Sequence, residues 1–183
     1  MMNRMPIKKM VLCALFAALT AVCAQISIPL GAVPVTLQLL PIVLCAALMT
    51  PKYATLSNAV YLLMGLVGLP VFAGLGGGAG KLFGVTGGYL IGFLPCAFLT
   101  SLIIAKWGKE WYKMAVAMVV GVAVCYAFGT AWFMATKGLG LMATLGICVI
   151  PFIPGDCMKI ALAVVLAKRL ESMISSSPVC TTR

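Results

Sequence analysis

Long apolar segments dominate the chain and are separated by short stretches rich in glycine, proline or charge. Six segments are predicted as membrane helices, at about 10–28, 39–49, 54–67, 86–105, 114–135 and 153–171. A helix needs roughly 20 apolar residues to cross a bilayer, so the second and third segments are short for a full crossing. The pattern predicts an all-α integral membrane protein, a bundle of six transmembrane helices in one domain over 1–183, with a broken entry to the sixth helix.

The composition supports this class of fold. Hydrophobic residues make up 63% of the chain and charged residues only 9%, against roughly 25% charged residues in soluble domains. The net charge of +10 is dispersed between apolar segments, which favours anionic lipid headgroups over nucleic acid as its partner. Histidine is absent, and the eight cysteines form no C-x-x-C pair. Neither a metal site nor a catalytic residue is therefore expected, and the cysteines are predicted to be small buried hydrophobes.

The basic residues predict the orientation of the bundle. With six crossings and a cytoplasmic N-terminus, ten of the thirteen lysines and arginines face the cytoplasm, whereas Lys81 and Lys137 face outward. This asymmetry follows the positive-inside rule. The basic N-terminus (1–9) and the polar tail (175–183) are then cytoplasmic. Three irregular stretches converge on the outer side: 29–38, 68–85 and 151–156.

The stretch 151–159 (PFIPGDCMK) places a carboxylate and an ammonium group inside an apolar segment. A charge at the centre of a bilayer costs roughly 2.5–3.5 kcal/mol on insertion scales, so such groups are rarely without a function. The Pro154-Gly155 pair is expected to break the helix and leave Asp156 at an N-cap position. The i, i+3 spacing puts Asp156 and Lys159 on one helical face. The two groups either bind a compact ligand or neutralise each other as a structural pair.

Further polar and aromatic residues could complete an outward-facing pocket. The glycine-rich loop (68–80) carries Phe72 and Gly74 and is expected to form a lid, with an exposed surface loop as the alternative. Its Gly80-Lys81 pair is no P-loop, because Leu75 and Leu82 replace the required glycine and Ser/Thr. The other candidates offer amides or ring faces: Gln38, Asn58, Tyr89 and Trp132. For Asn58 the alternative is a helix–helix hydrogen bond, and for Trp132, as for Tyr126, an interfacial or packing role.

Four motifs in order resemble the BioY family, the biotin-specific substrate-binding (S) components of energy-coupling factor (ECF) transporters. The motifs are VPVTLQ (33–38), GLPVFAG (68–74), TGGYLIGF (86–93) and PFIPGDxxK (151–159). The resemblance implies high-affinity biotin capture at the outer face of a bacterial plasma membrane. It also implies a six-helix bundle in which the loop after the third helix caps the site. One departure is Val85, where a proline commonly precedes the Thr-Gly-Gly motif.

The resemblance further implies roles for individual residues and partners. Asp156 and Lys159 would contact the ureido ring of biotin, and Lys81 is a candidate for its carboxylate. Small residues of the first helix would dock on the ECF transmembrane coupling protein: Ala14, Ala18, Ala17 and Ala21. Two partner ATPase subunits would supply the energy, so the chain itself needs no cofactor.

Three other functions stay open. The chain could be an S component for another small vitamin. It could be an autonomous proton-coupled biotin carrier that uses Asp156 as its proton site. The main rival from another class is a membrane-embedded enzyme, but its support is thin, because Glu110 and Glu171 lie at the cytoplasmic face and acid–base chemistry would rest on Asp156 and Lys159 alone.

Overall fold

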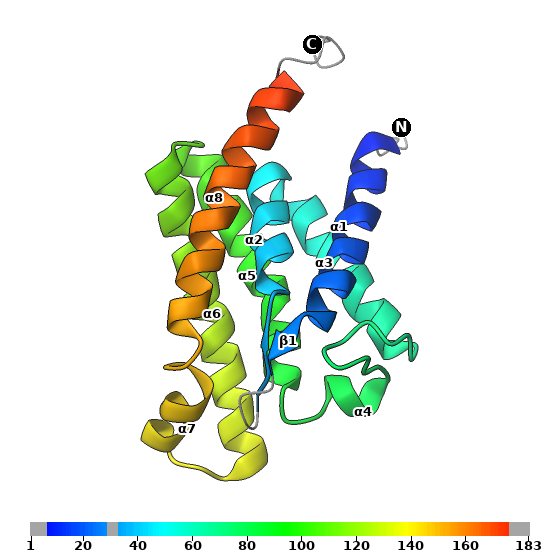
Figure 1. Cartoon of the computed structure of the whole chain (residues 1–183), viewed down its shortest axis with the longest axis vertical. Coiled ribbons are helices and arrows are strands. Elements are labelled where there is room, and N and C mark those ends of the chain that lie inside the picture. Colours follow the sequence, from blue (N-terminus) through cyan, green and yellow to red (C-terminus); the bar gives the residue numbers. More distant parts are fainter. Residues whose placement is uncertain (1–6, 29–32, 176–183) are drawn as a thin grey trace.

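The computed structural model describes residues 7–28 and 33–175, with side chains as far as Ser172. The basic N-terminus (1–9), the loop 29–38 and the tail (175–183) therefore lie partly outside the described residues. Eight helices and one two-stranded sheet make up the described part (Figure 1). The helices are α1 (Ile7–Gln25), α2 (Leu39–Leu48), α3 (Pro51–Leu66), α4 (Ala79–Leu82), α5 (Gly87–Trp107), α6 (Trp111–Lys137), α7 (Leu141–Cys148) and α8 (Ile153–Ser175). The strands are β1 (Ser27–Ile28) and β2 (Val35–Thr36).

Helix α2 lies at the centre of the bundle (Figure 1). Its residues 39–47 are all buried, and α1, α3, α5 and α8 pack around it. Its sequence is apolar on every face, which is the pattern of a helix surrounded by protein. Because neighbouring helices surround α2, they also fix the positions of its first residue, Leu39, and of the preceding Gln38, and both residues line the cavity described below.

Helices α5 and α6 form the most extensive helix pair and meet at glycines. A Cβ atom added at Gly88 would lie 2.2 Å from Cβ of Trp132, and one added at Gly129 would lie 2.3 Å from the ring of Tyr89. Small residues allow this close approach of membrane helices. The pair therefore sets the position of Tyr89 against α6.

The first helix ends at Gln25 rather than near residue 28. Ser27 pairs with Thr36, and Ile28 with Val35, in an antiparallel ribbon. The sequence predicts an irregular loop over 29–38, but Val35 and Thr36 within it form strand β2, which corrects this expectation. The ribbon brings Thr36 next to the cavity.

The helix break before α8 also lies earlier than the sequence predicts. Helix α7 ends at Cys148, α8 begins at Ile153, and the two helices are bent by 51°. The Asp156 N–H donates to Phe152 O at 2.9 Å, so Asp156 lies inside the first turn and is not the N-cap. Pro154 fits this first turn because N–H groups there have no intrahelical acceptor.

The other helix boundaries shift by a few residues from the expected segments. Helix α3 starts at Pro51, since proline is well suited to the first helical position. Helix α5 continues to Trp107 and ends at Gly108, whose φ of 95° favours glycine. The connection between the expected segments 86–105 and 114–135 is therefore shorter in the structure and spans only 108–110.

Several of the described helices are suited to a bilayer. Three of them, α1, α5 and α6, are long and apolar enough to cross it, and the bent pair α7–α8 would make a fourth. Helix α2 is apolar but has only 10 residues, about 15 Å of a hydrocarbon core of about 30 Å. The chain is thus a helical membrane protein. Six of the seven described cysteines are buried, and none of the seven forms a disulfide.

Candidate functional site

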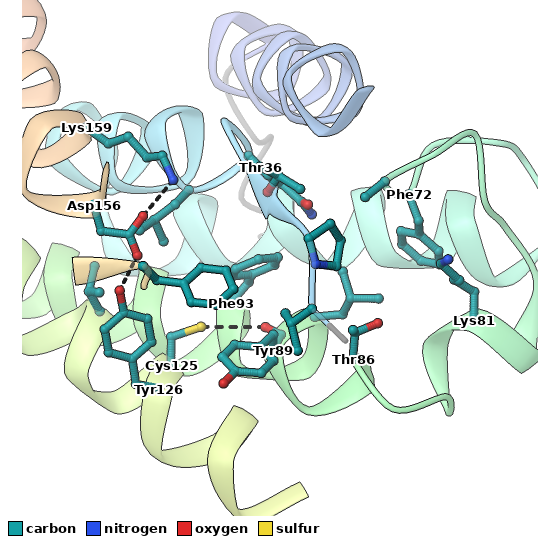
Figure 2. A pocket seen from close by; sticks show the side chains of 18 residues that line it. Thr36, Phe72, Lys81, Thr86, Tyr89, Phe93, Cys125, Tyr126, Asp156 and Lys159 are labelled. Atoms are coloured by element: carbon teal, nitrogen blue, oxygen red, sulfur yellow. Dashed lines mark hydrogen bonds and ion pairs between the residues drawn. The ribbon is translucent and has the colours of Figure 1, made fainter. Parts of the chain in front are cut away.

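A cavity of about 160 Å³ lies where the ribbon, the glycine-rich loop and helices α2, α5, α6 and α8 meet (Figure 2). Most of its wall is apolar, formed in large part by Leu39, Phe72, Leu90, Phe93, Val122 and Phe152. The polar side chains with the strongest donors and acceptors are Gln38, Lys81, Tyr89, Tyr126, Asp156 and Lys159. An apolar wall with a few polar groups is typical of a site for a small organic molecule.

A polar cluster of the buried Asp156 and Lys159 and the half-buried Tyr126 forms one end of the cavity (Figure 2). Lys159 Nζ lies 2.6 Å from Asp156 Oδ1, and the Tyr126 hydroxyl donates to Asp156 Oδ2. Asp156 and Lys159 are only 5% and 7% exposed. A buried ion pair needs such additional hydrogen bonds to offset its loss of hydration. The two charges therefore neutralise each other and also face the cavity, so the two readings of the sequence are compatible.

A second set of contacts fastens the glycine-rich loop (68–80) to α2 and α3. Gln38 Nε2 donates to the Tyr61 hydroxyl at 2.7 Å, and that hydroxyl donates to Val71 O at 3.1 Å. The Phe72 ring meets Tyr61 edge-on, with 5.6 Å between ring centroids. A Cβ atom at Gly65 would lie 2.0 Å from Phe72, so only glycine leaves room for this ring. The contacts hold Phe72 in the cavity wall.

Gln25, the last residue of α1, holds the same loop from another side. Its Nε2 lies 3.4 Å from Pro70 O and 3.2 Å from Phe72 O. Its Oε1 accepts a hydrogen bond from the Leu75 N–H at 2.9 Å. Among the described residues Leu75 is the non-glycine residue with a positive φ, 54°. A single side chain thus bonds to three residues of the loop.

The cavity brings together six of the nine residues that the sequence predicts for a binding site: Gln38, Phe72, Lys81, Tyr89, Asp156 and Lys159. The other three do not line it. Asn58 Nδ2 donates to Ala54 O within α3, so its bond is intrahelical rather than between helices. Trp132 Nε1 donates to Gly84 O at 3.0 Å. Gly74 lies in the loop with a φ of 70°.

Sequence reasoning missed Tyr126 as a lining residue and placed it among interfacial or packing aromatics. Val122, Cys125 and Tyr126 all line the cavity. Their spacing of three and four residues puts them on one face of α6. Gly129 lies on the same helix, one turn further, and packs against α5. This spacing relative to the glycine face was the signal that could have found Tyr126.

The four alanines predicted to dock a partner fall on different faces of α1. Ala14 and Ala18 are exposed, Ala21 is half-buried and Ala17 is buried. Exposed apolar residues continue the outer face on either side, including Val11, Leu15 and Val22. A partner approaching α1 from outside would therefore meet Ala14 and Ala18, but not Ala17.

The comparisons with known proteins agree with one another. The profile of the BioY family matches residues 1–176. Over 167 residues the chain is 40% identical to a "Probable biotin transporter BioY" of Pyrococcus horikoshii, covering 91% of this chain and 98% of that protein. It is 38% identical over 167 residues to the "Biotin transporter BioY" of Thermotoga maritima, covering 91% and 97%. A crystal structure of "the S-component for biotin from an ECF-type ABC transporter" superimposes with a TM-score of 0.86 at 32% identity, over 94% of this chain and 95% of that one. The resemblance inferred from the four motifs is thereby confirmed, and the chain belongs to the BioY family.

Proposed function

We propose that the chain captures biotin in the cavity and acts as the S component of an ECF transporter. Its relatives are named biotin transporters, and BioY proteins are transport proteins rather than enzymes. The observation that carries the proposal for this chain is the buried Asp156–Lys159 ion pair, bonded to Tyr126, at one end of a mostly apolar cavity. A ureido ring offers two N–H donors and one carbonyl acceptor. A carboxylate beside an ammonium group complements both.

The ion pair has spare hydrogen-bonding capacity for such a ring. A carboxylate offers about four lone-pair sites and a lysine three N–H donors. Lys159 and Tyr126 each bond to one oxygen of Asp156, so about half of these sites stay open. Lys159 uses one of its donors on Asp156. Asp156 can therefore accept from a ureido N–H while Lys159 donates to the ureido oxygen, and the pair need not separate.

For transport, we propose six crossings, made by α1, α2, α3, α5, α6 and α8, with both termini cytoplasmic. The start of α1 and the end of α8 lie at one end of the bundle, and α4 and α7 lie at the other (Figure 1). Lys8 and Lys9 belong to the first end, and Lys81 and Lys137 belong to segments of the second. The positive-inside rule then places the cavity towards the outer face.

The energy for uptake would come from partner subunits. We propose a transmembrane coupling protein, docked on the exposed Ala14 and Ala18 face of α1, and two ATPases bound to it. The glycine-rich loop of the chain lacks the P-loop residues needed to bind a nucleotide phosphate. On this proposal ATP acts only in the partners, and biotin is the substrate rather than a cofactor.

Equilibrium binding of biotin to the purified protein tests the proposal. Asp156→Asn and Lys159→Ala should each weaken binding by roughly 10- to 100-fold, since hydrogen bonds to charged groups contribute about 1.5–3 kcal/mol. Lys137→Ala, a change outside the cavity, should leave binding unchanged. No tight binding by the unmodified protein, or unaltered binding by both site variants, would refute the assignment.

Two further measurements separate the alternatives. Competition with a panel of small vitamins would show whether the cavity prefers a ligand other than biotin. Uptake in cells lacking the partner ATPases, measured with and without a proton gradient, would reveal an autonomous carrier. The S-component proposal requires that uptake depend on the ATPases.

A further inference from the structure

Basic and aromatic side chains gather where the α5–α6 connection meets the C-terminal part of α8, at the end of the bundle that also holds the start of α1 (Figure 1). Lys109 Nζ lies 3.1 Å from Glu171 Oε1 and joins the two segments. Helices α6 and α8 also pack against each other. We call this group the basic patch, and its residues are Lys106, Trp107, Lys109, Trp111, Tyr112, Lys113, Lys168 and Arg169.

The two acidic residues beside the basic patch are already paired. Glu171 lies 3.1 Å from Lys109, and Glu110 lies 3.3 Å from Lys113. Hydrogen bonds from Tyr112 and Lys113, with a smaller effect of the Lys168 charge, hold the pKa of the Glu110 carboxyl below its usual value. Both acids are therefore charged at neutral pH, and each is matched by one lysine.

Three further cations of the patch keep their positive charge without a partner. Lys106, Lys168 and Arg169 are exposed, and within the part of the chain that the structure describes their side chains make no hydrogen bond or ion pair. The third acid of the sequence, Asp156, is paired inside the cavity. The patch thus has an excess of three positive charges that can meet an anion from outside the protein.

Exposed apolar side chains lead from the patch along both helices. On α6, Val116 and Val119 are exposed within the turns that follow the patch. On α8, Leu162 and Val165 are exposed and precede Arg169 at spacings that put all three on one helical face. A surface that is cationic and aromatic at its end and apolar beyond it matches an amphiphile at the membrane interface. The acidic surface of a soluble protein would leave the apolar part uncovered.

We propose that the basic patch binds the phosphate headgroup of an anionic phospholipid, whose acyl chains lie along the exposed apolar faces of α6 and α8. Charged hydrogen bonds from ammonium and guanidinium groups suit phosphate oxygens. The site is separate from biotin capture and does not depend on it. It also leaves α1 accessible to a partner, because α1 packs on α2 and α3, whereas the patch lies on α6 and α8.

Competition between lipids in vesicles tests the site, with Trp107 and Trp111 as reporters inside the patch. Brominated phosphatidylcholine quenches tryptophan on contact, and unbrominated lipid that displaces it restores the fluorescence. Phosphatidylglycerol should displace it roughly five- to 30-fold better than unbrominated phosphatidylcholine, which is the effect of one to two cations at a charged lipid surface. Trp132, the third tryptophan, is half-buried at the other end of α6 and is common to all variants.

Two matched double variants locate the effect. Lys168→Gln with Arg169→Gln should remove most of the preference for phosphatidylglycerol. Lys8→Gln with Lys9→Gln removes the same charge from α1 at the same end of the bundle and should leave the preference intact. All four side chains are exposed, so neither change should alter the helical content measured by circular dichroism.

Four results would overturn the inference. The first is an unmodified protein without a preference for phosphatidylglycerol, and the second is a preference that survives in the Lys168 and Arg169 variant. The third is an equal loss in both double variants, which would indicate a long-range effect of net charge. The fourth is loss of the preference on adding inorganic phosphate, compared with chloride at equal ionic strength, which would make the patch a site for a free anion. If the lipid preference is absent but ATP-dependent uptake falls in the Lys168 and Arg169 variant, the patch docks an acidic protein instead.

Discussion

Replacing Gln25 with alanine should release the glycine-rich loop (68–80) from the end of α1. The two N–H protons of the Gln25 amide are shared among Pro70 O and Phe72 O of the loop and Ala21 O of α1, and its oxygen accepts from Leu75, so two or three bonds to the loop form at one time. Each is worth about 0.5–1.5 kcal/mol net. Water regains part of this at an exposed loop, which leaves a loss of about 2 kcal/mol. Since about 1.4 kcal/mol is a factor of ten, the open population of the loop should rise roughly 30-fold.

Hydrogen exchange of the loop amides in detergent micelles measures this opening directly. Loss of protection should be confined to 68–80, and dissociation of biotin should accelerate by a similar factor because Phe72 belongs to the cavity wall. Gln25→Glu should also loosen the loop, since it keeps the acceptor for Leu75 but sets a carboxylate beside two carbonyl oxygens. Thr136→Ala serves as the control. It removes the hydroxyl hydrogen bonds to Trp132 O and Phe133 O at the C-terminal end of α6. Equal protection in Gln25→Ala and the unmodified protein would refute the reasoning.

Three other substitutions have defined outcomes. Tyr126→Phe removes the hydroxyl that donates to Asp156 and should weaken biotin binding about tenfold. A hydrogen bond to a charged group contributes about 1.5–3 kcal/mol, and water can replace part of it. Equilibrium binding checks this, and unchanged affinity would contradict it. Gly88→Ala forces α5 and α6 apart and should lower stability by about 1–3 kcal/mol, seen as a lower melting temperature. Gly146→Ala is the control and should leave the melting temperature unchanged, because no atom lies within 4 Å of the added Cβ. Ala18→Trp should leave biotin binding intact and abolish ATP-dependent uptake; uptake at the normal rate would argue against docking on this face of α1.

The buried charges of the site could be predicted from the sequence because their cost in an apolar segment makes them conspicuous. Asp156 and Lys159 needed only their spacing to be placed on one face. The break before α8 could not be located, because Pro154-Gly155 fits a helix break and also fits a first helical turn. The packing of α8 against α2 and α6 decides between the two.

Whether an isolated polar side chain points into the cavity could not be predicted from the sequence for a related reason. Gln38 and Asn58 both carry an amide in or next to a short helix, yet only Gln38 reaches the cavity. The rotation of a short apolar helix depends on its neighbours rather than on its own periodicity. Tyr126 is the converse case, since its direction follows from the close contact of α6 with α5.

Both members of the ion pair belong to consecutive turns of α8, whereas Phe72 belongs to the glycine-rich loop and Lys81 to α4, which follows it. The loop can therefore swing aside without separating Asp156 from Lys159. Biotin would then enter the cavity with its bicyclic ring first and leave it with its side chain first. On that sequence of events, how strongly the vitamin is retained and how quickly it exchanges are set by different segments, and evolution can adjust one without the other.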